Sequence, residues 1–391
     1  MRLNSTGRVA AVLASMGLGL AVCQPAQAAE TKSFVVSWLN TAMNNEPGDC
    51  PGGQNPTLDG LFKKIAAAQG VPQAEIDKMI EDGSWRRNYQ KYAINRGRID
   101  GKPANVYLNP ASAPDPNITL VENKFGIGFN LDGVVSPDDF TDPLTGETGV
   151  DNNLFRVQGC YERLRATPTT RPAGTELAWN GSRDGMPAWV IRVTGIDDLK
   201  NDDDVVVQIY LAKERAIRNA AGDVQGYMSY TVNPNPRMMG NRFRGRIVNG
   251  VFVSGEPLDH FYMTCDLRMQ PEFDFKQARL RMEFNADGSS RVFLGGYAPW
   301  QLSYLANMPA RHVSEGQSAI DAAGYYHALR RLADTDIDKT ETGIRTRISA
   351  TIQITGVPAF VAEPEPVTTV AERRRPASAE KTGGRVVASN R

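Results

Sequence analysis

The sequence has few of the residues from which recognisable catalytic and cofactor motifs are built. Its 391 residues contain three histidines and four cysteines. It has no Gly-x-Ser-x-Gly elbow, no Cys-x-x-Cys-His haem attachment, no glycine-rich phosphate loop and no histidine or cysteine spacing typical of zinc. Nucleophilic catalysis and zinc catalysis need such groups close to one another. The sequence therefore leans towards a non-enzymatic protein that needs no cofactor, and it leaves carboxylate-dependent hydrolysis open, with calcium as the one metal left open.

The sequence also has no excess of charge of either sign. Lysine and arginine together number 44, and aspartate and glutamate together also number 44. Proteins that bind nucleic acid usually carry a clear basic excess, because the phosphate backbone dominates their affinity. We therefore expect no nucleic acid among the partners of this protein.

The sequence also lacks an apolar run long enough to span a membrane. Its longest apolar run lies at the N-terminus. Arg2 and Arg8 precede the uncharged residues 9–22, and small residues follow up to Ala28. A transmembrane helix needs about 20 apolar residues, whereas a secretory signal has a positive start, a short apolar run and a small-residue cleavage site. We interpret residues 1–28 as a signal peptide cleaved near Ala28. The mature protein is then periplasmic or secreted and has no transmembrane segment.

Three of the four cysteines remain after such a cleavage, and disulfides form readily outside the cytoplasmic membrane. Cys265 lies on an all-apolar strand face, so we expect it to be buried as a small apolar residue. Cys50 and Cys160 lie beside glycines in turn-like sequence. We predict a Cys50–Cys160 disulfide, with two free thiols as the alternative. Lipidation of Cys23, within the signal, is a further alternative, although the preceding valine fits lipoprotein processing poorly.

Apolar and polar residues alternate along the stretch from about residue 188 to residue 297. The clearest apolar face consists of Phe261, Met263, Cys265, Leu267 and Met269. A period of two indicates half-buried strands, because successive side chains of a strand point to opposite faces. Asn249-Gly250 and Asp287-Gly288 separate consecutive runs and suit two-residue turns. The pattern predicts a mainly β fold of the α+β type: a twisted antiparallel sheet or β-sandwich with helices packed on one side.

The chain divides into four parts by pattern and composition. They are the signal peptide (1–28), a helical, loop-rich N-terminal region (29–165), an antiparallel β domain with a C-terminal helix and a return strand (166–361) and a tail (362–391). Helices are expected at 30–45, 57–69 and 73–81 and after a cap at Ser318, the sheet from about Glu176, and the return strand at 344–354. The tail contains too few large apolar residues to fold, so we expect it to be disordered.

Two acidic segments leave calcium open as a ligand. One is the loop 136–153, which is rich in the aspartate and asparagine oxygens that calcium selects. In the other segment three aspartates alternate: Asp334, Asp336 and Asp338. Their spacing resembles the first half of an EF-hand loop, but Lys339 stands in place of the glycine and Arg345 in place of the bidentate glutamate. Solvated turns are the simpler interpretation of both segments.

Arginines gather on the polar side of several predicted strands. By strand parity the group consists of Arg242, Arg244, Arg246, Arg268, Arg279, Arg281 and Arg291, with Tyr262 on the same side as Arg268. If their strands are neighbours, these residues meet only two in-strand acids, Asp266 and Glu283. Guanidinium groups suit planar recognition of carboxylate, sulfate or phosphate. We therefore predict a binding face for an anionic envelope polymer or an acidic protein, with pairing to acidic turns such as 202–204 or to helix acids as the alternative.

The leading functional hypothesis is thus a non-enzymatic extracytoplasmic binding or accessory protein. One alternative is a carboxylate-dependent hydrolase of an envelope or extracellular polymer, with Asp266 and Glu283 as its acids. Another is a structural protein of the envelope stabilised by calcium. A cleft with two acids would favour the hydrolase, and a flat arginine-rich face without such a cleft would favour binding.

Overall fold

The computed structural model describes residues 29–165, 171–264, 272–307 and 319–363. The expected signal peptide and nearly all of the expected tail lie outside these residues, as do Cys265, Asp266, Arg268 and Ser318. Within the described ranges, no helix is both long and apolar enough to cross a membrane.

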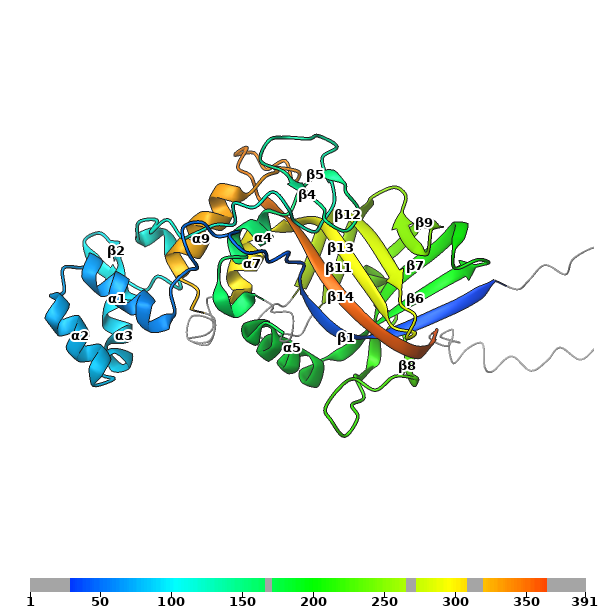
Figure 1. The fold of residues 1–391 in the computed structure, drawn as a ribbon, viewed down its shortest axis with the longest axis horizontal. Helices are drawn as coiled ribbons and strands as arrows, with labels where there is room; N and C mark the ends of the chain where they lie inside the picture. Colours follow the sequence, from blue (N-terminus) through cyan, green and yellow to red (C-terminus); the bar gives the residue numbers. More distant parts are fainter. Residues whose placement is uncertain (1–28, 166–170, 265–271, 308–318, 364–391) are drawn as a thin grey trace, which may run out of the picture.

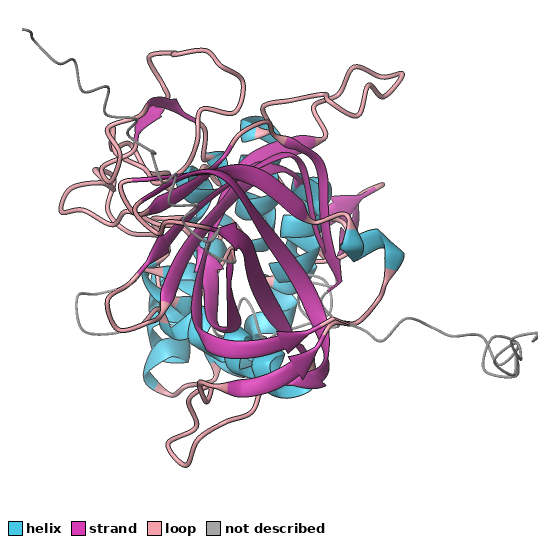
Figure 2. Cartoon of the chain, turned by 90° about the vertical axis from the view of Figure 1, so that its right-hand side faces the viewer, coloured by secondary structure: helices cyan, strands magenta, loops and turns pink. Residues whose placement is uncertain are grey.

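Eight antiparallel strands form a closed barrel (Figures 1 and 2). In order around the barrel they are β1 (Glu30–Thr41), β6 (Pro187–Ile196), β7 (Asn201–Arg215), β9 (Arg242–Val248), β10 (Val251–Ser254), β12 (Glu272–Phe284), β13 (Ser290–Pro299) and β14 (Arg347–Ala362). The barrel closes because β1 pairs with β6 along one edge and with β14 along the other. Two short strands extend it: β11 (Leu258–Thr264) pairs with the first half of β12, and β8 (Met228–Thr231) runs parallel to the end of β14.

The alternation in the sequence separates the inside of the barrel from its outside. Trp189 and Ile191 of β6 belong to the main hydrophobic core, whereas Val190 packs in a separate outer cluster with Tyr230 of β8. Between β9 and β10, Asn249 and Gly250 have φ angles of 52° and 83°, which a two-residue turn of this kind requires. The predicted antiparallel, mainly β fold is therefore confirmed.

The sheet closes into a barrel, and does not form the sandwich offered as one alternative, because of its first strand. Residues 30–45 were predicted to be helical, and this prediction is wrong: they contain β1. Phe34 and Val36 belong to the barrel core and Val35 to the outer cluster. Such β-branched and aromatic residues favour strands when both faces are buried. With a partner on each side, β1 turns an open sheet into a cylinder.

One group of helices gathers at one end of the barrel and does not line one face of a sheet (Figures 1 and 2). They are α4 (Asn153–Gln158), α5 (Ala173–Gly185), α7 (Trp300–Asn307) and α9 (Ala322–Leu332). Beyond them lies a helical unit made of α1 (Leu58–Ala68), α2 (Gln73–Glu81) and α3 (Trp85–Tyr92), which share a small core around Phe62, Ile76 and Trp85. The helices expected at 57–69 and 73–81 are confirmed, whereas α5 occupies the place where the sheet was expected to begin.

Short elements connect these parts. They are η1 (Ile94–Arg96), β2 (Gly97–Ile99), β3 (Lys102–Ala104), η2 (Pro110–Ser112), β4 (Phe140–Thr141), β5 (Thr148–Val150), η3 (Glu162–Leu164) and α6 (Pro236–Met239). Asp321 is the N-cap of α9 and accepts a hydrogen bond from the Gly324 amide at 2.6 Å. The return strand is confirmed as β14, although it begins at Arg347 and runs on to Ala362.

The predicted disulfide joins Cys50 and Cys160. Cys160 is buried in a small cluster with Phe140 and Phe155. Beside the disulfide, Asn55 and Tyr161 form an isolated parallel bridge. The disulfide therefore fastens the segment that leads into α1 to the segment that carries Tyr161.

Candidate functional site

The arginines predicted to form one face divide into an open group and a covered group. Arg242, Arg244 and Arg246 occupy alternate positions of β9 and are exposed. Phe243 and Ile247 of the same strand are buried in the main core. β9 therefore presents its three arginines on the outside of the barrel.

A fourth arginine, Arg192 of β6, lies on the same part of the barrel wall. It stands opposite Gln208 of β7, which in turn stands opposite Arg242 of β9. Neighbouring strands are about 4.8 Å apart, and alternate residues lie about 7 Å apart along a strand. We call Arg192, Arg242, Arg244 and Arg246 the open arginine surface. The sequence pattern places Arg192 on the polar side of its strand but does not reveal that β6, β7 and β9 are neighbours.

The open arginine surface is only partly neutralised by nearby acids. Arg192 forms an ion pair with Glu363, just after β14. Arg244 approaches Asp204 at 3.5 Å, and both side chains are at least 70% exposed, so solvent screens this pair strongly. Arg242 and Arg246 form no ion pair with any residue in the described ranges. The alternative of pairing with the acidic turn 202–204 therefore accounts for Arg244 alone.

Arg281 does not belong to an open face, because the segment 127–142 folds over it. Its Nη2 atom lies 2.8 Å from Oδ2 of Asp142, and the two side chains are 5% and 0% exposed. The rings of Phe129 and Phe293 flank the guanidinium, with centroids 5.5 and 4.8 Å away. Arg281 is thus part of a buried ion pair that attaches this segment to the barrel.

Two further arginines of the predicted face are also occupied or partly covered. Arg291 binds Glu283 through Nε and Nη2 at 2.8 and 2.6 Å. This pair removes Glu283 as a free acid for hydrolysis. Arg279 is half-buried, and its Nε atom is buried without a hydrogen-bond partner. Neither residue continues the open arginine surface.

Tyr262 is buried and not part of an exposed polar face. Its hydroxyl donates to Glu272 at 3.0 Å, and the guanidinium of Arg237 lies 3.6 Å from its ring centroid. Burial and the hydrogen bond to Glu272 raise the pKa of this phenol. The expected neighbour Arg268 and the acid Asp266 lie outside the described residues.

Two of the three aspartates weighed as calcium ligands, Asp334 and Asp338, have protein partners. Asp334 accepts hydrogen bonds from the Ser349 amide and from Asn153 Nδ2, each at 3.0 Å, and burial raises its pKa. Asp338 forms ion pairs with Lys276 and Arg347. Within the described ranges, no group of three or more His, Cys, Asp or Glu side chains is placed to hold a metal ion. Asp336 is therefore not brought together with the other two into a calcium cage.

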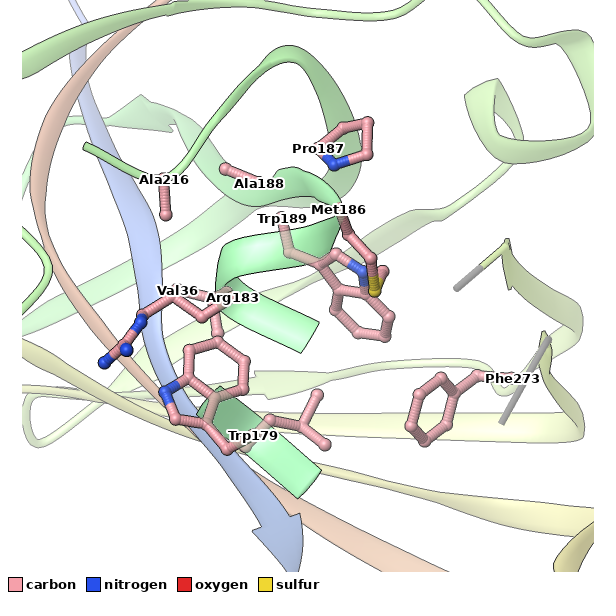
Figure 3. A pocket seen from close by; sticks show the side chains of 10 residues that line it. Val36, Trp179, Arg183, Met186, Pro187, Ala188, Trp189, Ala216 and Phe273 are labelled. Atoms are coloured by element: carbon pink, nitrogen blue, oxygen red, sulfur yellow. The ribbon is translucent and has the colours of Figure 1, made fainter. Parts of the chain in front are cut away.

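A small pocket lies at the end of the barrel beneath α5 (Figure 3). The side chains of Trp179, Met186, Trp189 and Phe273 line it, with the stem of Arg183 at its edge. Its volume is about 40 Å³, little more than the space of one water molecule. No carboxylate lines this pocket, so it offers no site for acid–base hydrolysis.

A larger pocket of about 420 Å³ lies between α1 and the extended segment 113–118. The single carboxylate in its lining belongs to Asp321, which forms an ion pair with Arg96 at 2.8 Å. Neither pocket therefore contains the two carboxyl groups that glycoside hydrolysis needs.

Comparison with known proteins assigns no family. No family model, no curated protein and no solved structure matches the chain.

Proposed function

We propose that this protein is an exported, non-enzymatic binding protein that docks on a linear anionic polysaccharide of the cell envelope. The observation that carries the proposal is the open arginine surface, where three arginines alternate along β9 and Arg192 lies two strands away on β6, across Gln208 of β7. Two of them, Arg242 and Arg246, have no carboxylate partner among the described residues. Guanidinium forks suit carboxylate and sulfate groups, and a row of them suits a repeating anion.

Binding is favoured over polymer hydrolysis by the distribution of acids. A glycoside hydrolase needs two carboxyl groups about 5–10 Å apart on either side of the scissile bond. Glu283, one of the two acids weighed for this role, is bound to Arg291. Both pockets also lack an acid pair.

The proposal is tested by measuring binding of residues 29–391 to dextran sulfate, with uncharged dextran as the control polymer. The variant Arg242→Gln/Arg244→Gln/Arg246→Gln removes the charge of β9 and keeps the side-chain stems. The matched control, Lys78→Gln/Arg87→Gln/Lys91→Gln, removes the same charge from exposed positions of α2 and α3. Measurements at about 50 and about 300 mM NaCl separate charge-dependent binding from other binding.

We expect dextran sulfate to bind at low salt and to weaken as salt rises. The β9 variant should lose affinity at least about tenfold, because three charge-assisted contacts disappear. The control variant should stay within about twofold of the parent. An equal loss of affinity in both variants would mean that binding depends only on net charge. Preferential binding of an acidic protein would identify a different partner. Either result overturns the proposal.

A further inference from the structure

The last strand of the barrel ends on the open arginine surface. Ala359 and Val361 of β14 pack in the outer cluster, against the wall formed by β1, β6 and β7. Glu363 follows them in the same alternation and forms an ion pair with Arg192. Strand β8 pairs with the end of β14 and holds it there (Figure 1). Residues 364–391 therefore leave the barrel directly beside the open arginine surface.

The phenol of Tyr210 on β7 relates Glu363 to the arginines of both flanking strands. Burial and the charge of Glu363 raise the pKa of this phenol, and the charges of Arg192 and Arg242 lower it. The interaction of two charges weakens with distance and with screening by solvent. Glu363, Arg192 of β6 and Arg242 of β9 thus lie around the same side chain, and the end of β14 is close to both arginine-bearing strands.

The residues that follow the end of β14 are acidic. Glu363, Glu365 and Glu372 are the only charged residues from 363 to 372, which we call the acidic segment. From Arg373 to the C-terminus the balance reverses, with six basic residues and one acidic residue. The part of the tail that is attached next to the arginines is therefore the part with the complementary charge.

Two prolines favour an extended start of the acidic segment. Pro364 and Pro366 follow Glu363 and Glu365, and a residue before proline is restricted to extended conformations. Alternate residues of an extended chain point to the same side and lie about 7 Å apart. The side chain of Glu363 already faces the barrel wall through its ion pair with Arg192. The same alternation directs Glu365 towards that wall.

The acidic segment is long enough to reach the two arginines that lack a carboxylate partner within the described ranges. Arg242 lies two strands from Arg192, about 10 Å away, and Arg246 lies four residues further along β9, about 14 Å. An extended chain rises about 3.1 Å per residue. The chain from Glu363 to Glu372 therefore spans about 28 Å, which covers both distances.

We infer that the acidic segment lies across the open arginine surface and competes there with the anionic polysaccharide. Glu363 neutralises Arg192, while Glu365 and Glu372 supply carboxylates to Arg242 and Arg246. The inference rests on the proposed function, because the displaced ligand is the polysaccharide.

Tethering gives this competition its selectivity. A segment joined to its binding surface by a short chain has an effective concentration in the millimolar range. Each exposed ion pair contributes little by itself. An isolated small anion therefore does not displace the acidic segment, whereas a polymer that offers many linked anions does. The acidic segment thus restricts the open arginine surface to multivalent anions.

Contact between the acidic segment and β9 is tested by NMR of isotope-labelled residues 29–391 without any polymer. In the variant Arg242→Gln/Arg246→Gln we expect the backbone amide signals of Glu365 and Glu372 to shift, because their partners lose charge. In the reciprocal variant Glu365→Gln/Glu372→Gln the amide signals of β9 should shift.

Matched controls remove the same charges from exposed residues of the helical unit. They are Lys78→Gln/Lys91→Gln and Glu75→Gln/Glu81→Gln, on α2 and α3. Neither control should shift the signals of the acidic segment or of β9. The melting temperature of each variant is compared with that of the parent, so that a change of signals is not mistaken for unfolding.

Competition is tested with dextran sulfate at about 50 mM NaCl. Glu365→Gln/Glu372→Gln should raise the affinity at least about threefold, because two competing carboxylates are removed from the surface. The control Glu75→Gln/Glu81→Gln, with the same net charge, should stay within about 1.5-fold of the parent. At about 300 mM NaCl the gain should shrink, because salt screens the internal ion pairs as well as the polymer contacts.

The outcomes distinguish this inference from the proposed function. Unchanged signals in both reciprocal variants would show that the acidic segment does not contact β9, and would overturn the inference even when dextran sulfate binds. Reciprocal shifts with an unchanged affinity for dextran sulfate would show contact without competition, which overturns it too. Failure of dextran sulfate to bind both the parent and Glu365→Gln/Glu372→Gln would overturn the proposed function and with it the competition.

Discussion

A buried ion pair between Arg281 and Asp142 decides how the segment 127–142 covers the barrel wall. Asp142 is fully buried and also accepts from the amides of Gly128 and Leu144, at 3.2 and 2.7 Å. Removing one partner of such a pair leaves the other charge buried and uncompensated, which costs far more than a surface ion pair.

We predict that Arg281→Ala lowers the free energy of unfolding by about 3–5 kcal/mol. Arg246→Gln, on the exposed wall, should change it by less than about 0.5 kcal/mol. Urea denaturation of both variants measures the difference. A similarly small change in the free energy of unfolding of both variants would mean that water or another group compensates the buried charge of Asp142.

Asp151 is a second residue whose environment has a measurable consequence. Burial, together with the neighbouring charges of Asp132 and Asp334, raises its pKa from 3.8 to about 7, and the hydrogen bond from the Leu131 amide opposes this rise. The folded protein therefore keeps a proton on Asp151 that the unfolded chain releases near pH 4. Because the folded state binds more protons in this window, stability falls as pH rises from about 4 to about 7.

Asp151→Asn should remove this pH dependence and keep an acceptor for the Leu131 amide. We expect the variant to melt at least about 2 °C above the parent at pH 8 and at nearly the same temperature at pH 4. Calorimetric melting curves across this range provide the test. A variant that is less stable at pH 8 would show that the charged carboxylate is favoured in the folded state.

At the scale of the element, β1 has the largest effect on architecture, since it supplies the strand that joins β6 to β14. A proline within a strand that is paired on both sides removes a ladder hydrogen bond and strains the sheet. At a bulge the same residue is tolerated. The register of β1 against β6 shifts between Glu30 and Lys32, which places Thr31 at such a position.

We predict that Val35→Pro lowers stability by about 3 kcal/mol or more and exposes sheet edges that associate, whereas Thr31→Pro costs much less. Size-exclusion chromatography and urea denaturation would record both effects. Equal behaviour of the two variants would mean that barrel closure does not depend on β1.

The disulfide also acts at the scale of the element, because it joins the segment that leads into α1 to the segment that carries Tyr161. The two cysteines are separated by 110 residues. Closing a loop of this length stabilises a protein by about 4–5 kcal/mol in the chain-entropy model. Cys50→Ser/Cys160→Ser should therefore melt well below the parent, and dithiothreitol should lower the melting temperature of the parent alone. An effect of dithiothreitol on the variant would point to a different thiol.

For the whole molecule, an apolar barrel core and aspartates that already have protein partners predict indifference to chelators. The barrel interior is apolar, and Asp334 and Asp338 already bind Ser349, Lys276 and Arg347. We expect EDTA to leave the melting temperature unchanged and added calcium not to raise it, since a bound ion would stabilise the folded state by mass action. A lower melting temperature in EDTA, restored by calcium, would support the calcium-stabilised structural protein instead.

Features that depend only on neighbouring residues can be predicted from the amino-acid sequence. Period-two alternation indicates the strands between residues 188 and 297, and Asn249-Gly250 indicates a tight turn, because both follow from local backbone geometry. Helices α1 and α2 follow from apolar spacing and a terminal glycine. The disulfide follows by elimination once Cys265 is assigned to an apolar face.

Features that depend on distant partners follow only from the folded chain. The segment 30–45 is ambiguous in isolation, and β1 becomes a strand because β6 and β14, more than 140 residues away in sequence, offer it two edges. Strand parity puts Arg281 on the outer wall, but only folding of the segment 127–142 buries it. The pocket between α1 and the segment 113–118 likewise unites residues from 55 to 321. The local sequence pattern cannot predict such contacts, because they depend on how the whole chain packs.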